Sequence, residues 1–499
     1  MSKIKKEFSK LDGYLFPNGK RNRVFQSWDR DNNGYPLEDE QVKKLIAVRP
    51  TPLQAEISDL EFYTFIHFGM NTFTGVEWGT GKESPSQFCP KEIDTDQWAR
   101  VIKKSGSRGV IFTAKHHDGF CLFQTAYTEH SIKNSPYKNG KGDLVRELSE
   151  SCKKEGLLFG IYLSPWDMHE ETYGTKAYDD YFVNQLTELC ENYGEIFNFW
   201  FDGARGKNAV NFVYDFERYY KVIHEKQPKA AICNCGPDVR WIGNEAGVVR
   251  ESEWSVIAGH NVAVEKVMAA SQQGEDDTVK LREIDFQAKD LGSREALRGR
   301  DDLRWSPGEA DVSIHLGWFH NPKPRPRSAK ELEKIYFRTV GGNALLLLNV
   351  PPSKNGVIES SDVKLLEDFK ARVDEKFVSA LDFEAFTEGG RELSSVKEED
   401  GGEELKKGDG ALVLKLSEPK KIKTLVLRED ITKSQRIERF EVFFKAKNGF
   451  RKVFLGTTVG SKRIVLFPSS LQNPTDEVRV YITQSRSCPV IRSIALFGE

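Results

Sequence analysis

Titratable and aromatic side chains follow four successive apolar segments in the first half of the chain. His67-Phe68-Gly69 ends the first segment, and Lys115-His116-His117-Asp118 ends the second. The third segment contains Tyr162 and runs on to Trp166-Asp167, and the fourth ends in Trp200-Phe201-Asp202-Gly203. One such ending would carry little information. Four in succession predict an active site that uses carboxylate, imidazole and aromatic groups.

Asp202 is the carboxylate that this pattern singles out. It follows the apolar run 196–201, so its backbone should be largely buried. A buried carboxylate costs free energy unless it is paired or used in chemistry. The alternative role is structural, in which Asp202 caps the next helix or bonds a neighbouring loop.

Two further groups are open to more than one interpretation. His116 and His117 are adjacent, and neighbours in a regular strand point to opposite faces. One could therefore line the site while the other packs outside it, although both can reach the same side where the pleat relaxes at a strand end. Glu77 lies in a loop with nearby glycines, where a solvated surface role is the alternative.

A metal centre is the main rival for these groups. His67, His116 and Asp202 could resemble a hydrolase zinc site, but no His-X-His pair follows the first segment and the usual spacing of zinc ligands is absent. No glycine-rich phosphate loop followed by Lys-Ser or Lys-Thr occurs either. We therefore expect neither a metal nor an organic cofactor.

The elements that must position these groups recur between residues 60 and 377. Short apolar runs alternate with amphipathic helical stretches, which indicates a parallel sheet with both faces covered. Eight runs predict an irregular (β/α)8 TIM-like barrel, in which catalytic groups lie at the carboxyl ends of the strands. The charged stretch 265–305 is expected to form a long loop. The expected strands are 64–70, 109–115, 158–164, 196–202, 230–235, 247–254, 311–318 and 344–350.

The pattern changes after about residue 378, where strands with polar connections predict a β-sandwich. We therefore expect an N-terminal extension at 1–50, a catalytic barrel at 51–377 and a C-terminal β-sandwich at 378–499. The expected sandwich strands are 411–416, 423–427, 439–445, 452–456, 463–467, 478–482 and 491–497.

Composition excludes several classes of partner. The chain has 73 basic and 75 acidic residues, a balance that argues against a nucleic-acid partner. No window approaches ~18 consecutive apolar residues, so no membrane span is expected. The charged N-terminus lacks the apolar stretch of a secretory signal, and the seven cysteines are an odd number, which together favour a cytoplasmic protein. Nothing in the sequence indicates the oligomeric state.

Six motifs resemble those of the α-L-fucosidases of glycoside hydrolase family 29, and they occur in the expected order over about residues 60–375. The resemblance implies an irregular (β/α)8 catalytic domain followed by a β-sandwich, which agrees with the strand pattern. The motifs are His67-Phe68-Gly69, Glu77-Trp78-Gly79, Ala114-Lys115-His116-His117-Asp118-Gly119-Phe120, Trp200-Phe201-Asp202-Gly203, Gly317-Trp318-Phe319-His320 and Leu346-Leu347-Leu348-Asn349-Val350-Pro351-Pro352.

The resemblance also implies roles for individual residues. Asp202 corresponds to the nucleophile of a retaining exo-α-L-fucosidase. Imidazoles and a carboxylate would bind the fucose hydroxyls, and aromatic faces would cover the ring and its methyl group. The residues expected to line the fucose pocket are His67, Glu77, Trp78, His116, His117, Tyr162, Trp200 and Trp318.

The acid/base is expected in the segment 236–254, because the family does not keep this residue at one position. Trp241-Ile242-Gly243-Asn244-Glu245 resembles the subgroup that acts on α-1,3 and α-1,4 branches, which favours Glu245. Glu251 and Glu253 are the alternatives, and each of the three could instead be a surface charge or an ion-pair partner of Arg240 or Arg250.

The expected substrates are therefore fucosylated oligosaccharides or glycans of the Lewis type. A fucosidase of broad specificity and a non-catalytic fucose-binding protein are the alternatives. The C-terminal residues are loosely similar to galactose-binding-like sandwiches. Such a sandwich could bind sugar, close the barrel mouth or brace the barrel.

Overall fold

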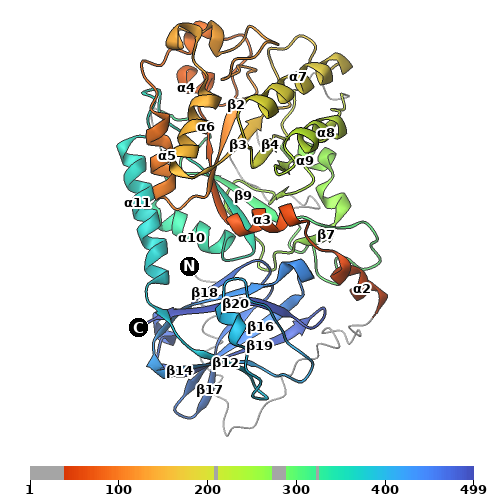
Figure 1. Cartoon of the computed structure of the whole chain (residues 1–499), viewed down its shortest axis with the longest axis vertical. Coiled ribbons are helices and arrows are strands. Elements are labelled where there is room, and N and C mark those ends of the chain that lie inside the picture. The colour runs from red at the N-terminus through yellow and green to blue at the C-terminus, as the bar shows by residue number, and fades with distance from the viewer. Residues whose placement is uncertain (1–38, 207–211, 272–287, 322–324) are drawn as a thin grey trace.

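An eight-stranded parallel sheet forms the upper half of the molecule in Figure 1, and two antiparallel sheets form the lower half. The computed structural model describes residues 39–206, 212–271, 288–321 and 325–499. Residues 1–38 of the expected N-terminal extension and 272–287 of the expected charged loop lie outside this part of the chain.

The parallel sheet runs in the order β5-β4-β3-β2-β1-β10-β9-β6. A parallel bridge between Cys233 and Val239 joins the two outermost strands, so the sheet curls into a nearly closed barrel. The predicted (β/α)8-like fold is therefore confirmed. The strands are β1 (Phe62–Ile66), β2 (Gly109–Lys115), β3 (Leu158–Leu163), β4 (Asn198–Phe201), β5 (Ala231–Asn234), β6 (Arg240–Trp241), β9 (Gly308–Ser313) and β10 (Ala344–Asn349).

Alternating side chains separate the barrel interior from its outer shell, because successive strand residues point to opposite faces. In β1, Tyr63 and Phe65 pack inside the barrel, whereas Phe62 and Ile66 pack against the surrounding helices. Both faces are apolar, which explains why these strands read as nearly continuous apolar runs.

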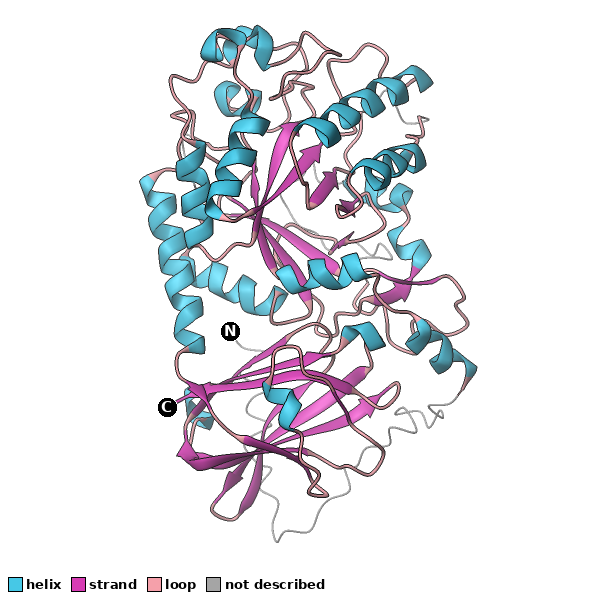
Figure 2. Ribbon diagram, viewed as in Figure 1, coloured by secondary structure: helices cyan, strands magenta, loops and turns pink. Residues whose placement is uncertain are grey.

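Helices cover the outside of the barrel (Figure 2). Several begin at a side chain that accepts a backbone N–H, as Asp94 does for α5, Asp143 for α6 and Ser328 for α10. The helices are α2 (Glu40–Ala47), α3 (Pro52–Leu60), α4 (Met70–Thr74), α5 (Thr95–Lys104), α6 (Leu144–Glu155), α7 (Lys176–Asn192), α8 (Phe216–Lys226), α9 (Val264–Ser271), α10 (Ala329–Thr339) and α11 (Ser360–Asp374).

The expected strand at 247–254 is wrong. The sixth strand is instead the short β6, and the segment that follows it runs down the outside of β9. A Cβ on Gly247 would meet Ile335 of α10 and Val312 near the carboxyl end of β9. Farther along, Val249 packs against a cluster that includes Ala310, in the middle of β9. This segment is apolar because it packs between β9 and the next helix, a position that a sequence pattern cannot distinguish from a buried strand.

The C-terminal sheets confirm the predicted β-sandwich, and each of the seven expected strands overlaps an observed one. One sheet has the order β11-β20-β15-β18 with β13 paired to β20, and the other has the order β12-β14-β19-β16-β17. The strands are β11 (Ala380–Leu381), β12 (Glu384–Thr387), β13 (Glu403–Glu404), β14 (Leu412–Lys420), β15 (Ile422–Glu429), β16 (Ile437–Ala446), β17 (Gly449–Gly456), β18 (Arg463–Leu466), β19 (Thr475–Ser485) and β20 (Val490–Gly498).

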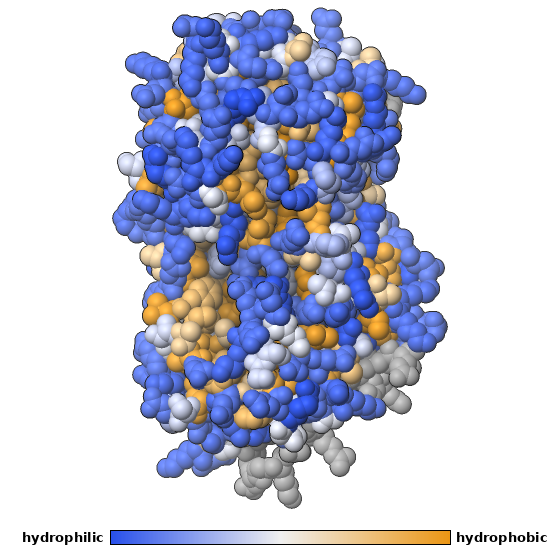
Figure 3. Space-filling model, in the orientation of Figure 1, coloured by the Kyte–Doolittle hydropathy of each residue, from blue (hydrophilic) through white to orange (hydrophobic). Residues whose placement is uncertain are grey.

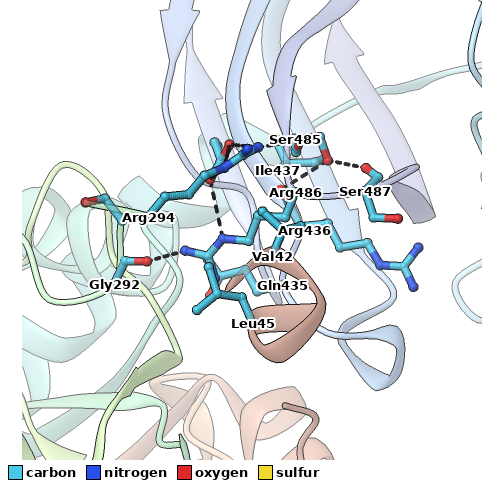
Figure 4. Close-up of polar contacts among 12 residues, drawn as sticks. Val42, Leu45, Gly292, Arg294, Gln435, Arg436, Ile437, Ser485, Arg486 and Ser487 are labelled. Atoms are coloured by element: carbon cyan, nitrogen blue, oxygen red, sulfur yellow. Dashed lines mark hydrogen bonds and ion pairs between the residues drawn. The ribbon is translucent and has the colours of Figure 1, made fainter. Parts of the chain in front are cut away.

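Buried arginines join the sandwich to the barrel (Figure 4). Arg294 of the barrel domain donates to Glu438 and to the Ser485 carbonyl oxygen. Arg486 of the sandwich donates to the Gly292 carbonyl oxygen, and its guanidinium carbon lies 3.7 Å from the centre of the Trp254 ring. The barrel-domain residues of this interface lie close in sequence to a small antiparallel pair of strands, β7 (Val256–Ala258) and β8 (Leu303–Trp305).

The surface shown in Figure 3 is mostly hydrophilic, and hydrophobic residues gather mainly towards the middle of this face. Among the described residues, no helix is both long and apolar enough to cross a bilayer.

Candidate functional site

The carboxyl ends of β1 to β4 bring the predicted site residues together. The His67 ring lies 5.8 Å from the His116 ring and 5.6 Å from the Tyr162 ring, measured between centroids. The Tyr162 ring stacks on the Trp200 ring at 5.5 Å. The site therefore lies at the end of the barrel where TIM-barrel enzymes carry their catalytic groups.

Asp202 directly follows β4, and its carboxylate is held at both oxygens. Tyr162 donates its hydroxyl to Oδ2 at 2.9 Å, and the Ala204 backbone N–H donates to Oδ1 at 2.8 Å. The side chain is 22% exposed, so a small molecule can reach it. Burial raises the pKa of Tyr162 far above its usual value, so its hydroxyl stays protonated and remains a donor.

His117 lies beside this carboxylate, with its Nε2 atom 3.8 Å from Asp202 Oδ2. Ser164 donates its hydroxyl to the Trp166 carbonyl oxygen and therefore accepts from His117 Nδ1 at 2.7 Å. This fixes the tautomer and leaves Nε2 as an acceptor in the neutral ring. Burial lowers the pKa of His117, although the Asp202 charge partly opposes this.

His67 is fixed by Asn349 at the end of β10. The Asn349 amide nitrogen donates to the Trp318 carbonyl oxygen at 2.8 Å, so its oxygen accepts from His67 Nδ1 at 2.9 Å. Burial lowers the pKa of His67 to about 4, which keeps the ring neutral near pH 7 with Nε2 as an acceptor.

His116 has the opposite tautomer. Its Nδ1 atom faces the Asn71 amide nitrogen at 3.4 Å, and that amide also donates to the Glu77 carbonyl oxygen. Nδ1 must therefore accept, and Nε2 carries the proton. Burial is the main cause of the strongly lowered pKa of His116, and the neighbouring His117 and His67 add to it. Neutral imidazoles that present both donors and acceptors suit the hydroxyl groups of a sugar.

Glu77 and Trp318 join two loops across the site. Glu77 Oε2 accepts from the Trp318 backbone N–H at 2.8 Å. Gly317 makes this contact possible, because a Cβ there would lie 2.4 Å from Glu77 Oε1. The Trp318 ring lies 5.1 Å from the His67 ring, and the Trp78 ring lies 5.9 Å from the His117 ring. The pocket residues expected from the sequence therefore lie in one contact network.

The three candidate acid/base residues occupy different environments. Glu253 is 0% exposed and ion-paired with Arg240 and Arg250. The Glu251 carbonyl oxygen accepts from Thr457 of the sandwich, which ties that residue to the domain boundary. Glu245 is exposed and lies on the segment above β6, and its charge acts on Asp311 inside the barrel. Of the three, within the described part of the chain, only Glu253 is a buried ion-pair partner, and only Glu245 acts on a carboxyl group inside the barrel.

Sequence reasoning missed two acidic residues inside the barrel. Glu309 accepts from Trp200 Nε1 at 2.7 Å and from the Tyr63 hydroxyl, and burial raises its pKa to about 7. Asp311 accepts from Trp241 Nε1 at 2.7 Å. The expected strand at 311–318 starts three residues after the first residue of the observed β9. The alternation in Gly308-Glu309-Ala310-Asp311-Val312 is the signal that could have revealed both residues.

Asn349 is a third residue that the site uses and the sequence reasoning did not single out. It is the polar end of an otherwise apolar strand, and that pattern could have identified it. Across the described ranges 39–206, 212–271, 288–321 and 325–499, no group of three or more His, Cys, Asp or Glu side chains is arranged to hold a metal ion.

Comparison with known proteins gives consistent matches. Residues 49–371 match the family model for alpha-L-fucosidase. Alpha-L-fucosidase 1 of Arabidopsis thaliana is 36% identical over 87% of this chain and 84% of that protein. A glycoside hydrolase 29 family member from a rumen bacterium is 35% identical, with a TM-score of 0.73 over 90% of this chain and 77% of the other. A Ruminococcus gnavus GH29 fucosidase solved with fucose is 27% identical, with a TM-score of 0.77 over 91% and 95% of the two chains.

Proposed function

This chain belongs to the α-L-fucosidase family, glycoside hydrolase family 29, and we propose that it is a retaining exo-enzyme that releases α-1,3- or α-1,4-linked L-fucose from branched glycans. The observation that carries this proposal is the Asp202 carboxylate, which is held by Tyr162 and Ala204 and is still partly exposed at the barrel mouth. A nucleophile needs this combination of a fixed position and access to the substrate.

The first step of the proposed mechanism forms a covalent fucosyl-enzyme. An Asp202 oxygen attacks the anomeric carbon, the glycosidic C–O bond breaks, and Glu245 gives its proton to the departing oxygen. In the second step Glu245 takes a proton from water, the water oxygen attacks the anomeric carbon, and the bond to Asp202 breaks. Two inversions give net retention, which in retaining enzymes requires carboxyl groups ~5–5.5 Å apart.

The proposed pocket binds fucose through alternating polar and aromatic groups. The acceptor nitrogen of His67 and the donor nitrogen of His116 suit hydroxyls, as does the Glu77 carboxylate. The faces of Trp78, Trp200 and Trp318 suit the apolar C–H face and the methyl group of L-fucose. A fucose-binding protein without turnover is the weaker alternative, because binding alone would not require an accessible Asp202 beside His117.

Replacing the proposed acid/base tests this assignment. We expect Glu245→Ala to lose most activity on oligosaccharides but to keep the first step on aryl fucosides whose phenol is a good leaving group. Azide, which needs no general base, should restore turnover and give fucosyl azide. Glu251→Ala is the matched control, since it removes an exposed carboxylate of the same segment. Full activity of Glu245→Ala, or a loss in Glu251→Ala instead, would contradict the assignment.

Linkage specificity rests on the likeness of residues 241–245 to the branch-cleaving subgroup, and it needs its own test. We expect release of fucose from a Lewis-type trisaccharide at a much higher kcat/KM than from an α-1,2-fucosylated lactose. Similar rates on both substrates and on an aryl α-L-fucoside would instead identify an enzyme of broad specificity. The configuration of the first-formed fucose, followed by proton NMR, tests retention.

A further inference from the structure

A second carboxyl group lies beneath the proposed acid/base residue. Asp311 is on β9 and is only 4% exposed, and it points into the barrel because its neighbours Ala310 and Val312 pack in the outer clusters. The Trp241 indole donates to Asp311 Oδ1 at 2.7 Å. The mechanism described above does not use this buried acidic side chain.

The register of β6 and β9 explains why Asp311 meets this segment. Trp241 pairs with Glu309, and the Ile242 backbone N–H donates to the Glu309 carbonyl oxygen at 2.8 Å. The Trp241 side chain then reaches Asp311, two residues farther along β9. The chain from Trp241 to Glu245 is only five residues long and leaves the barrel at this point. The indole is thus a side-chain anchor at the start of the segment that carries Glu245.

The charged groups that act on Asp311 are both acidic. They are Glu245, on the segment that follows β6, and Glu309, two residues before Asp311 on β9. Arg240 of β6 is turned away from the barrel interior and is ion-paired with Glu253. Burial and these two charges raise the pKa of Asp311 well above its usual value. A protonated Asp311 carries no charge and can still accept the indole N–H.

We propose that Asp311 is a positioning residue for the general acid, because it holds the Trp241 indole and with it the segment that carries Glu245. The inference rests on the proposed role of Glu245 as acid/base. A general acid must lie within hydrogen-bond reach of the oxygen that it protonates, so the placement of its segment matters for the rate.

Two variants test the proposal. Asp311→Asn keeps an oxygen that can accept from Trp241. We expect its kcat/KM on oligosaccharides to stay within about threefold of the wild type, because the indole keeps its partner. Trp241→Phe removes the indole donor. It should lower kcat/KM roughly tenfold on oligosaccharides, and less than about threefold on an aryl fucoside with an acidic phenol that needs no protonation.

Trp98→Phe is the matched control, because Trp98 Nε1 also donates one buried hydrogen bond, to the Gly356 carbonyl oxygen at 2.9 Å, but on the outer shell. It should not change the dependence on leaving group. A loss in Asp311→Asn as large as that in Trp241→Phe, or equal losses on both substrates in Trp241→Phe, would overturn the proposal. If Asp311→Asn does not fold, the leaving-group comparison in Trp241→Phe decides alone.

Glu245→Ala distinguishes this failure from failure of the proposed function. If azide rescues Glu245→Ala but Trp241→Phe loses activity equally on both substrates, only the positioning role is wrong. If Glu245→Ala is fully active, the acid/base assignment itself is wrong.

Discussion

The Tyr162 hydroxyl is the side-chain donor that holds Asp202 Oδ2, at 2.9 Å. A hydrogen bond to a charged group contributes about 1.5–3 kcal/mol, so we expect Tyr162→Phe to lower kcat/KM by roughly 10- to 150-fold. Tyr193→Phe is a matched control, because Tyr193 donates to Asp143 at the same 2.9 Å distance but beside α6. Equal activity in both variants would mean that Tyr162 does not orient the nucleophile.

The buried side chain of Asp118 predicts how the stability of the protein depends on pH. Burial, together with Glu83 and Asp167, raises its pKa to about 7 from 3.8. Between these values the native state holds the extra proton, so the free energy of unfolding falls as pH rises through this window. Asp118→Asn removes this effect and keeps the acceptor for the Phe120 N–H.

Thermal unfolding of Asp118→Asn and the wild type between about pH 5 and 8 tests this prediction. The melting temperature of the variant relative to the wild type should rise with pH and level off above the folded pKa. A difference that stays constant over this range would contradict it.

At the scale of single residues, the sequence predicts the polar and titratable residues that follow the strands. Asp202, His116 and His117 were recognisable because polar groups follow apolar runs. Asn349 and Ser164 were not singled out, because their role is to fix a histidine tautomer, and that depends on contacts between strands far apart in the sequence. Both histidines after β2 reach the same side, since the regular pleat ends at Lys115.

At the scale of elements, the loop Gly317-Trp318 depends on one glycine. Gly317 has a φ of +92° and lies against Glu77, whereas Gly156 at the end of α6 has a φ of +65° with no atom near its missing Cβ. We expect Gly317→Ala to displace Glu77 and lower kcat/KM at least about tenfold, while Gly156→Ala adds only the backbone strain. Similar kinetics for the two variants would show that the Glu77 contact is not needed.

The regular part of the barrel was predictable and its irregular part was not. In units with a strand and a helix of ordinary length, such as β2 with α6, the sequence changes from a continuous apolar run in the strand to apolar residues three or four apart in the helix. The segment 247–254 packs on the outside of β9 without forming a strand, so its apolar residues indicate burial and not an additional strand. β6 has only two residues, too few to produce a periodic pattern.

At the scale of the whole molecule, the sandwich is joined to the barrel domain near the proposed acid/base segment, 236–254. Gln435 accepts from the Ser255 N–H at 2.8 Å and donates to the Glu253 carbonyl oxygen at 3.0 Å. These contacts favour a bracing role among the roles expected for the sandwich. Its likeness to galactose-binding domains stays a prediction.

Arg486 tests how much this interface contributes to stability. It is fully buried, contacts Trp254 and donates to the Gly292 carbonyl oxygen, while Glu438 keeps Arg294 as its partner. We therefore expect Arg486→Met to lower the free energy of unfolding by about 1–3 kcal/mol. Arg492→Met is the control, because Arg492 also joins the sandwich to the barrel domain, through Asp59, but near the surface, where a pair contributes about 0–1 kcal/mol. If urea unfolding shows the same loss of free energy of unfolding in both variants, the distinction between the buried and the surface contact is wrong.

The most direct test of the mechanism is to trap the covalent intermediate. Glu245→Ala is mixed with an aryl α-L-fucoside whose phenol is acidic, so that the first step proceeds and the second lacks its base. Quenched protein is then digested and mapped by mass spectrometry. We expect a fucosyl group on the peptide that contains Asp202, and none when Asp202 is also replaced by Asn. A fucosyl group on another residue, or release of fucose with inverted configuration and no adduct, would contradict Asp202 as the nucleophile.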